Sequence, residues 1–557
     1  MAQTATNSPV VHNPAPQKLH AVRPRHMVPP MTLDRTIANL DEPDLVRLAQ
    51  LIAFTVRPGD LIALHGDLGA GKTTFARAFI QALTHPIVTE VPSPTFTLVQ
   101  TYDTQRLKLA HFDLYRLNDP SELDELGLDE AVSHGAAIVE WPERAQGRLT
   151  GTRLDIVIAE STTSVDTRDI TLTAASTWAP RLERLITIRD FLARSGHASD
   201  TLHYLQGDAS VRRYARVTGP DGNPTILMDW PRQPDGPPIR DGLPYSRIAH
   251  LAEDVRPFVA IGQYLANAGF STPTIHAHDL DAGLLIIGDF GDAVFGSTIG
   301  KTASQSDLWR TGVDTLVALR ASTPPAQLPL PGGSTVTMPA YNHQALGIET
   351  ELLLDWYWPA VHGTPVPGGV QAEYNQLWSA VFDRLATLPQ GWSLRDYHSP
   401  NLLALPDRAP PQNVGIIDFQ DAQIGPHAYD LVSLLQDARV DVPAALEAEL
   451  LAHYCDTVAA SDPAFHRRSF EWSYAALGAQ RNSKILGIFA RLAHRDGKPA
   501  YVAHIPRIWS YLVRDLTHPE LAALAAWYDR AFPPTIRAKP VASSRSHHPP
   551  RERPHDT

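Results

Sequence analysis

Residues 66–73 read G-D-L-G-A-G-K-T, a complete match to the Walker A pattern G-x-x-x-x-G-K-[ST]. The apolar run from Leu61 to His65 before it has the length of a strand, and Thr74 to Leu83 has the spacing of a helix. This order gives a strand, a glycine turn and a helix whose N-terminal N–H groups face phosphate. The motif therefore constrains the first part of the chain to an α/β fold that binds a nucleotide.

The residues of this turn have separate expected roles. The glycines let the backbone curl so that its N–H groups point at phosphate oxygens. Lys72 is expected to reach the β- and γ-phosphates of ATP, and the hydroxyl of Thr73 is expected to bind Mg²⁺. The expected nucleotide-binding set is Gly66, Asp67, Leu68, Gly69, Ala70, Gly71, Lys72, Thr73 and Thr74.

Two acids follow predicted strands further along the chain. Asp113 comes after the apolar run from Leu107 to Phe112, and Glu140 comes after Ala136 to Val139. Because ligands of such folds lie beyond the carboxyl ends of the strands, we expect both acids to hold Mg²⁺ or to orient the attacking water. The segment S-P-T-F at 93–96 lies where a nucleotide-sensing loop belongs, and a plain proline turn is the alternative.

A second constellation lies about three hundred residues later, by the printed sequence. Asp396 and Asn401 are five positions apart, and Asp418 follows a short apolar run from Val414 to Ile417. This reproduces the kinase arrangement D-x-x-x-x-N followed by a metal-binding acid. Asp396 is expected to accept the proton of a substrate hydroxyl, and Asn401 and Asp418 are expected to bind Mg²⁺. A small sheet-rich segment followed by a mostly helical one also predicts a kinase layout.

The expected phosphate-binding lysine of a kinase is missing from this region. Where a kinase carries V-A-I-K, the chain reads I-L-M-D, so that Asp229 stands near the lysine position. The segment G-D-A-S-V-R-R-Y at 207–214 is expected to cover the ATP phosphates. Arg212 or Arg213 is therefore expected to replace the lysine, the alternative being that both are solvated loop charges. Residues 285–290 are expected to form the hinge that binds adenine.

Length and composition predict several domains. A chain of 557 residues exceeds what one hydrophobic core supports. We expect disordered tails at 1–30 and 538–557, both rich in Pro, Ser and His, a first domain at 31–177 and a second at 178–537 that opens with a helix from Arg181 to Ala193. The proline-rich stretch from Pro324 to Pro339 is expected to be an insertion or long loop.

Charge and cysteine usage narrow the functional class. The net charge is −12, and residues 31–160 carry 11 Lys and Arg against 19 Asp and Glu, which argues against tight RNA binding by the first domain alone. The acids concentrated at 119–130 form either a solvated helix face or a docking surface for a basic partner. The single Cys455 suits a reducing cytoplasm. No apolar run reaches the length of about 18 residues that a membrane span needs, so we expect none.

Four motifs of the first domain carry a family resemblance. G-D-L-G-A-G-K-T-T, S-P-T-F-T-L-V, H-F-D-L-Y-R-L and V-E-W-P-E occur in order within about residues 35–175 and resemble the TsaE (formerly YjeE) family. The resemblance implies an α/β P-loop NTPase domain that hydrolyses Mg-ATP for threonylcarbamoyladenosine formation in tRNA. It implies TsaD and TsaB homologues as partners, with tRNA contacted only indirectly. Lys72, Thr73, Asp113 and Glu140 match its phosphate-, metal- and water-binding positions.

The second domain resembles a family of small-molecule kinases. L-R-D-Y-H-S-P-N, I-I-D-F and Y-D-L resemble the aminoglycoside phosphotransferase (APH) family, which implies a bilobal α+β protein-kinase-like fold. G-D-A-S-x-R-R-Y and L-M-D resemble its AmgK type, kinases of the anomeric hydroxyl of N-acetylmuramic acid and N-acetylglucosamine. By this resemblance Asp430 supports the catalytic loop, with Arg395 as a possible pairing partner. The alternatives are another acceptor (an aminoglycoside, choline or an amino alcohol) and a regulatory pseudokinase module.

Overall fold

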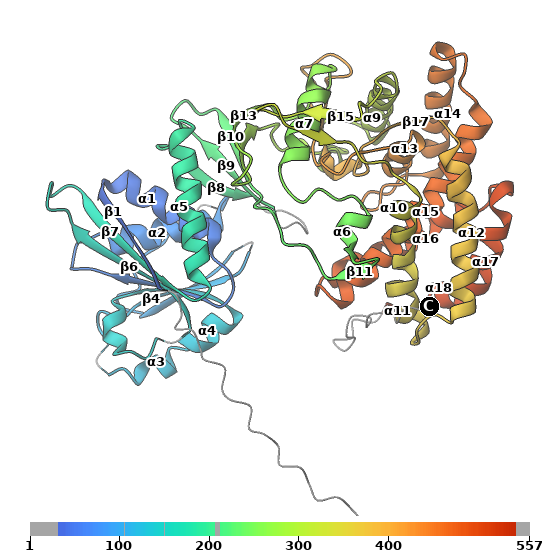
Figure 1. The fold of residues 1–557 in the computed structure, drawn as a ribbon. Coiled ribbons are helices and arrows are strands. Elements are labelled where there is room, and N and C mark those ends of the chain that lie inside the picture. Colours follow the sequence, from blue (N-terminus) through green and yellow to red (C-terminus); the bar gives the residue numbers. More distant parts are fainter. Residues whose placement is uncertain are drawn as a thin grey trace, which may run out of the picture.

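The computed structural model describes residues 32–541 except 88, 105, 118, 150 and 206–211. Most of the two predicted tails and of the phosphate-covering turn therefore lies outside the described residues. Residues 538–541 are described, and Val541 is buried in the core of the second half. Figure 1 shows two halves side by side, the first in blue and teal and the second from green to red.

A seven-stranded sheet organises the first half, in the order β1-β7-β6-β2-β5-β4-β3. Its four central strands β6, β2, β5 and β4 run parallel to one another, and the outer pairs β1–β7, β7–β6 and β4–β3 are antiparallel. The strands are β1 (Thr32–Leu40), β2 (Asp60–His65), β3 (Val99–Asp103), β4 (Lys108–Asp113), β5 (Gly135–Glu140), β6 (Thr152–Glu160) and β7 (Arg168–Ala175). The predicted α/β fold is confirmed.

Helices cover both faces of this sheet. On one face α1 (Glu42–Thr55) packs against α2 (Lys72–Thr84). The other face is covered by the short helices α3 (Glu122–Glu125) and α4 (Leu128–His134), and η1 (Pro142–Ala145) follows β5. The predicted helix at 74–83 is confirmed, and β1 adds an edge strand that the sequence patterns had not indicated.

Helix α5 (Trp178–Arg194) packs against the first sheet, although its position had suggested a start for the second unit. It contacts β1, β6, β7 and α1. Its Arg181 forms a buried pair with Asp60 at the start of β2, with N–O distances of 2.6 and 2.7 Å. The helix therefore connects the two halves, and the boundary at 177/178 stays a prediction.

The second half begins with a five-stranded antiparallel sheet, in the order β13-β14-β10-β9-β8. Its strands are β8 (Thr201–Leu205), β9 (Arg213–Thr218), β10 (Pro224–Asp229), β13 (Ile275–Asp279) and β14 (Leu284–Gly288). Helix α7 (Arg256–Asn267) follows this sheet in the chain, whereas the short pair β11 (Pro238–Arg240) and β12 (Leu243–Pro244) and helix α6 (Tyr245–Ile248) lie against α10 (His343–Leu352) of the larger lobe. The predicted sheet-rich segment at the start of the second half is confirmed.

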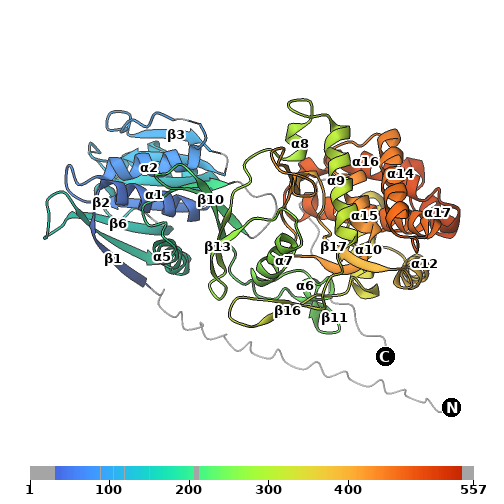
Figure 2. The same ribbon diagram turned by 90° about the horizontal axis from the view of Figure 1, so that it is seen from above.

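The larger lobe is mostly helical, as predicted. Its helices are α8 (Phe295–Thr298), α9 (Gln305–Arg320), α10 (His343–Leu352), η2 (Leu353–Tyr357), α11 (Trp358–His362), α12 (Gly368–Ala386), η3 (Ser399–Asn401), α13 (Ala428–Leu435), α14 (Ala444–Ser461), α15 (Arg467–His494), η4 (Pro499–His504), α16 (Ile505–Asp515), η5 (Pro519–Leu521), α17 (Ala522–Ala531) and α18 (Pro534–Arg537). Figure 2 shows α15 running through the middle of this bundle.

Three two-stranded antiparallel sheets also lie in the second half. They pair β15 (Gln327–Pro329) with β16 (Thr335–Thr337), β17 (Gln390–Ser393) with β20 (Gln423–Pro426), and β18 (Leu402–Ala404) with β19 (Val414–Ile416). The first of them lies within the stretch from Pro324 to Pro339, which was expected to be an insertion or long loop and contains a short strand pair. Its prolines stand at strand ends, where no ladder N–H is needed.

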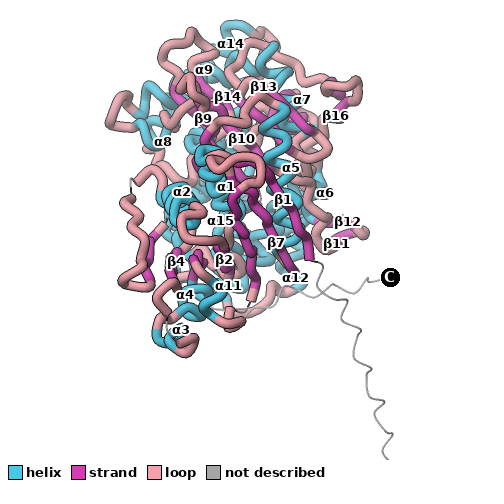
Figure 3. The backbone as a smooth tube through the Cα atoms, turned by 90° about the vertical axis from the view of Figure 1, so that its left-hand side faces the viewer, coloured by secondary structure: helices cyan, strands magenta, loops and turns pink. Residues whose placement is uncertain are grey.

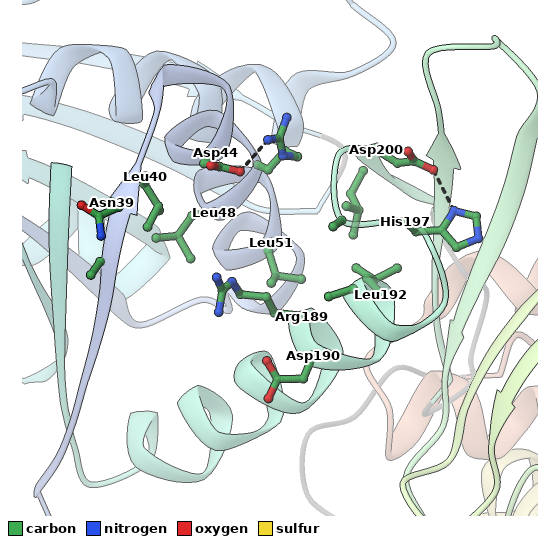
Figure 4. A pocket seen from close by; sticks show the side chains of 15 residues that line it. Asn39, Leu40, Asp44, Leu48, Leu51, Arg189, Asp190, Leu192, His197 and Asp200 are labelled. Carbon is green, nitrogen blue, oxygen red and sulfur yellow. Dashed lines mark hydrogen bonds and ion pairs between the residues drawn. The ribbon is translucent and has the colours of Figure 1, made fainter. Parts of the chain in front are cut away.

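The two halves share a hydrophobic core. One continuous buried cluster joins Leu51 and Phe54 of α1, side chains of α5, and residues such as Val217 and Leu227 of the second sheet. Helix α1 packs directly on β8, and Figure 3 shows α1 near the strands of both sheets. A pocket of about 390 Å³ opens beside this junction, between α1, α5 and the turn after α5 (Figure 4). In the described part of the chain, no helix is long and apolar enough to cross a membrane.

Candidate active sites

The glycine turn after β2 has the backbone that phosphate binding requires. Gly66, Gly69 and Gly71 have φ values of +141°, +81° and +113°, in the region that favours glycine. A Cβ on Gly66 would lie 2.4 Å from the carbonyl oxygen of Ile158. The turn therefore needs glycine at position 66 for space as well as for conformation.

Lys72 lies inside this turn at the start of α2. Its Nζ donates to the carbonyl oxygens of Gly66 and Asp67 at 2.7 and 2.8 Å, and lies 3.6 Å from the ring centroid of Trp141. Burial lowers the pKa of Lys72, and Glu140 is the largest opposing charge. The ammonium group is thus held among loop carbonyls, where phosphate oxygens can compete for its protons.

Glu140, at the end of β5, connects the turn to the sheet. Its Oε2 accepts a hydrogen bond from the hydroxyl of Thr73 at 2.9 Å, and its Oε1 lies 2.9 Å from Nε2 of His111. Both Glu140 and His111 are buried. His111 had not been predicted. The one available signal is its place on β4 two residues before Asp113, hence on the same face of the strand.

Asp113 lies beside Glu140, because these two residues are register partners on the parallel strands β4 and β5. Its Oδ2 accepts from the hydroxyls of Ser93 and Thr95 at 2.9 and 2.7 Å. The S-P-T-F segment therefore contacts the site directly, as a nucleotide-sensing loop requires. The structure brings Thr73, Asp113 and Glu140 to one edge of the sheet.

Asp396, Asn401 and Asp418 of the second constellation also lie close together. The Nδ2 of Asn401 donates to the carbonyl oxygen of Asp396 at 3.0 Å and to Oδ2 of Asp418 at 3.4 Å. The backbone N–H of Ile417 donates to the carbonyl oxygen of Asn401 at 3.1 Å. Asp418 itself has a φ of +61°, which turns its carboxylate out of the strand direction after β19. The backbone of Asp396 and the side chains of Asn401 and Asp418 are thus joined through Asn401.

The two candidate arginines take different places. Nη1 of Arg212 pairs with Oδ1 of Asp418 at 2.6 Å, whereas Arg213 pairs with the buried Asp229. Burial alone would lower the pKa of Arg212, but Tyr214 and Asp418 raise it. Of the two, Arg212 therefore lies in the site, and Arg213 points toward the first half.

Asp430 on α13 holds the backbone just before Asp396 in place. Its carboxylate accepts from the backbone N–H groups of Leu394 and Arg395 at 2.6 and 2.9 Å. Burial raises the pKa of Asp430 to about 7. The suggested pairing with the side chain of Arg395 is wrong: that guanidinium turns away and pairs with Glu349 on α10.

Glu349 is the centre of a buried polar cluster that the sequence had not indicated. Its Oε1 accepts from Arg395 and, at 2.8 Å, from Lys484 on α15. Its Oε2 accepts from the hydroxyl of Tyr341 and, at 3.0 Å, from Gln480. Burial alone would raise the pKa of Glu349, but Lys484 and Arg395 bring it down to about 2. An isolated Glu in a helical pattern carries no sign of this role.

Both constellations fit a magnesium nucleotide. Among the described residues no three His, Cys, Asp or Glu gather as an all-protein metal site. Magnesium needs less than that here, because it binds nucleotides through one or two carboxylates plus phosphate oxygens and water. Thr73 with Glu140 and Asp113, and Asn401 with Asp418, supply such partial sets of oxygen ligands.

Two family models match the chain in succession. "Threonylcarbamoyl adenosine biosynthesis protein TsaE" matches residues 40–170, and "Phosphotransferase enzyme family" matches residues 201–469. The resemblances carried by the motifs are thereby confirmed.

Curated relatives divide in the same way. An N-acetylmuramate/N-acetylglucosamine kinase of Caulobacter vibrioides is 36% identical over 62% of this chain and 96% of its own length. The same-named enzyme of Pseudomonas putida is 35% identical over 57% of this chain and 84% of its own length. The tRNA threonylcarbamoyladenosine biosynthesis protein TsaE of Bacillus subtilis is 44% identical over 23% of this chain and 77% of its own length. The chain therefore belongs to two families at once, the TsaE family through its first half and the N-acetylmuramate/N-acetylglucosamine kinase family through its second.

Proposed function

We propose that this chain is a bifunctional enzyme with two separate ATP sites. The observation that carries the proposal is the presence of two separate sets of candidate phosphate- and metal-binding groups in one chain. One set is built on the glycine turn, Lys72, Thr73 and Glu140. The other is built on Asn401, Asp418 and Arg212. The first set lies in the region matched by the TsaE family model, and the second lies in the region matched by the phosphotransferase family model.

The first half is proposed to hydrolyse ATP in the service of threonylcarbamoyladenosine formation in tRNA. Mg²⁺, bound with ATP, would neutralise phosphate charge. Thr73 and the acids Asp113 and Glu140 would hold that ion or orient the attacking water. Lys72 would bind the phosphates. We propose cytoplasmic homologues of TsaD and TsaB as partners, with tRNA contacted through them, because the acid excess of residues 31–160 suits protein docking better than RNA.

The second half is proposed to phosphorylate the anomeric hydroxyl of an amino sugar. Asp396 would accept the hydroxyl proton as the oxygen attacks the γ-phosphate. Asn401 and Asp418 would hold Mg²⁺, and Arg212 would supply the positive charge that the missing lysine supplies in other kinases. The kinases of Caulobacter and Pseudomonas support the sugar class by their names.

Two alternatives stand beside the sugar kinase: another hydroxyl acceptor and a regulatory module. The hydrogen bonds that Asp430 accepts from the backbone of Leu394 and Arg395 support catalysis, because they fix the residue next to Asp396.

The test uses the full chain with Mg-ATP. N-acetylglucosamine and N-acetylmuramic acid should each yield a sugar 1-phosphate and one ADP, whereas aminoglycosides, choline and ethanolamine should not. Without sugar, slow ATP hydrolysis should remain and should rise when TsaD and TsaB homologues are added. Phosphorylation of choline or an aminoglycoside in place of the sugars would refute the proposed acceptor, and tight tRNA binding by the chain alone would refute the indirect role.

A further inference from the structure

Asp229 stands on β10 where other kinases carry their phosphate-binding lysine. Its side chain is 0% exposed, yet it is fully paired. Oδ1 accepts from Nε and Nη2 of Arg184 on α5 at 3.0 and 2.6 Å. Oδ2 accepts from Nη2 of Arg213 on β9. A buried carboxylate held by two guanidinium groups in this way is strongly fixed in place.

The pairing of the two strands determines which arginine meets Asp229. Arg213 and Asp229 are direct partners across β9 and β10. Along this sheet, neighbouring side chains face opposite sides, so that Leu227 joins the core shared with the first half and Met228 joins the core of the second half. Asp229 faces the same side as Leu227. Because Arg213 is held on the side of the sheet that faces the first half, the preceding residue, Arg212, lies on the side that faces the core of the second half.

The position of Arg212 agrees with this alternation. Its guanidinium carbon lies 5.0 Å from the ring centroid of Trp230, a residue of the second core, and its Nη1 pairs with Asp418 at 2.6 Å. A slip of one residue between β9 and β10 would exchange the two arginines. The ion pair of Asp229 with Arg213 opposes such a slip.

The first half contributes to the same arrangement. The guanidinium carbon of Arg213 lies 4.9 Å from the ring centroid of Phe54 on α1. On β8, the ring of Tyr204 is covered by Arg106, which also donates to the carbonyl oxygens of Ala53 and Val56 around the end of α1. The face of the second sheet that carries Arg213 is therefore covered by the P-loop domain.

We infer that Asp229 is a positioning residue of the kinase ATP site, acting through Arg213 to place Arg212 against Asp418, and that Phe54 of the P-loop domain is part of the same device. The inference rests on the proposed kinase function. By this inference the first half is a structural component of the second site. Phe54 of α1 contacts Arg213, and Arg213 in turn fixes the position of Arg212, which replaces the missing kinase lysine.

The test is a double-mutant cycle in a Lys72→Ala background, which silences the first site. The Michaelis constant for ATP is measured with N-acetylglucosamine as acceptor. Arg212→Ala should raise it by about 10- to 100-fold, the range expected for a lost charge-assisted contact. Asp229→Asn should raise it to a similar extent, and Asp229→Asn combined with Arg212→Ala should be no worse than Arg212→Ala alone. If the two substitutions raised the Michaelis constant for ATP independently, so that their factors multiplied in the double variant, the inference would be overturned. Asp229 would then act without Arg212, as a general structural residue does.

Other variants keep the test decisive if Asp229→Asn folds poorly. Arg213→Met and Phe54→Leu should also raise the Michaelis constant for ATP. They should do so only in variants that keep Arg212, and not in combination with Arg212→Ala. The matched control is Leu123→Ala, a buried truncation on the opposite face of the first sheet, which should leave it unchanged. An equal effect of Phe54→Leu in the absence of Arg212 would overturn the role of the P-loop domain.

A second readout separates this inference from the proposed function. If the chain phosphorylates none of the sugars, the proposed function fails, but titration calorimetry with Mg-ADP still reports on the second site in the Lys72→Ala background. Arg212→Ala and Asp229→Asn should each weaken binding, without a further loss in the double variant. Unchanged Mg-ADP affinity in both single variants would overturn the inference.

Discussion

Glu349→Gln should destabilise the second half by about 3 kcal/mol at neutral pH. Glu349 lies at 0% exposure between Arg395 and Lys484. Although burial opposes the charge, these two cations bring the pKa of Glu349 from an ordinary 4.5 to about 2. At about 1.4 kcal/mol per tenfold change in proton affinity, that difference corresponds to roughly 3 kcal/mol of stability. Breaking a buried ion pair from one side costs a similar amount, about 3–5 kcal/mol.

The pH dependence has a definite sign. Because the folded-state pKa of Glu349 lies below the unfolded-state value, the stabilisation is complete above about pH 4.5 and is lost as the pH falls toward 2. The difference between the wild type and Glu349→Gln in free energy of unfolding should therefore be constant from pH 7 to 5 and should narrow below that range.

Urea unfolding monitored by tryptophan fluorescence measures this difference. Glu351→Gln is the matched control: it lies on the same helix, and its pair with Arg240 is on the partly exposed surface, where such pairs contribute about 1 kcal/mol or less. A loss below 1 kcal/mol for Glu349→Gln at pH 7, or a gap that widens in acid, would refute the reasoning.

Three further predictions concern the nucleotide sites. Gly66→Ala should abolish ATP binding to the first site, measured by titration calorimetry, because its Cβ would lie 2.4 Å from the Ile158 carbonyl oxygen; retained binding would contradict this. Glu140→Gln, which alters the acceptor of the Thr73 hydroxyl, should lower sugar-independent ATP hydrolysis by at least about 100-fold, and an undiminished rate would remove its proposed role. Asp418→Ala should weaken Mg-dependent ADP binding to the second site by calorimetry; binding that ignores both Mg²⁺ and this substitution would show that the metal ligands are elsewhere.

Much of the fold followed from local sequence patterns. The Walker A turn dictated a strand before it and a helix after it, and β2 and α2 are those elements. The spacing of Asp396, Asn401 and Asp418 brought these residues together in space, because the short hairpin of β18 and β19 returns the chain over that distance. Motifs succeed where the chemistry depends on a few neighbouring residues.

Other features depend on contacts between distant segments, which a single sequence does not show. The choice between Arg212 and Arg213 required the register of β9 against β10. His111 and Glu349 acquire their partners only in the folded chain. The shared core of α1, α5 and the second sheet could not be foreseen either, since apolar faces in both halves look like ordinary internal cores in the sequence.

The central claim, two separate ATP sites in one chain, is tested most directly by Lys72→Ala and Asp396→Asn in the full chain. Sugar-independent ATP hydrolysis and N-acetylglucosamine phosphorylation are measured on both variants and on the double variant. The account predicts a crossed pattern: Lys72→Ala loses hydrolysis and keeps phosphorylation, Asp396→Asn does the reverse, and the double variant loses both. Loss of both activities in either folded single variant would contradict the account.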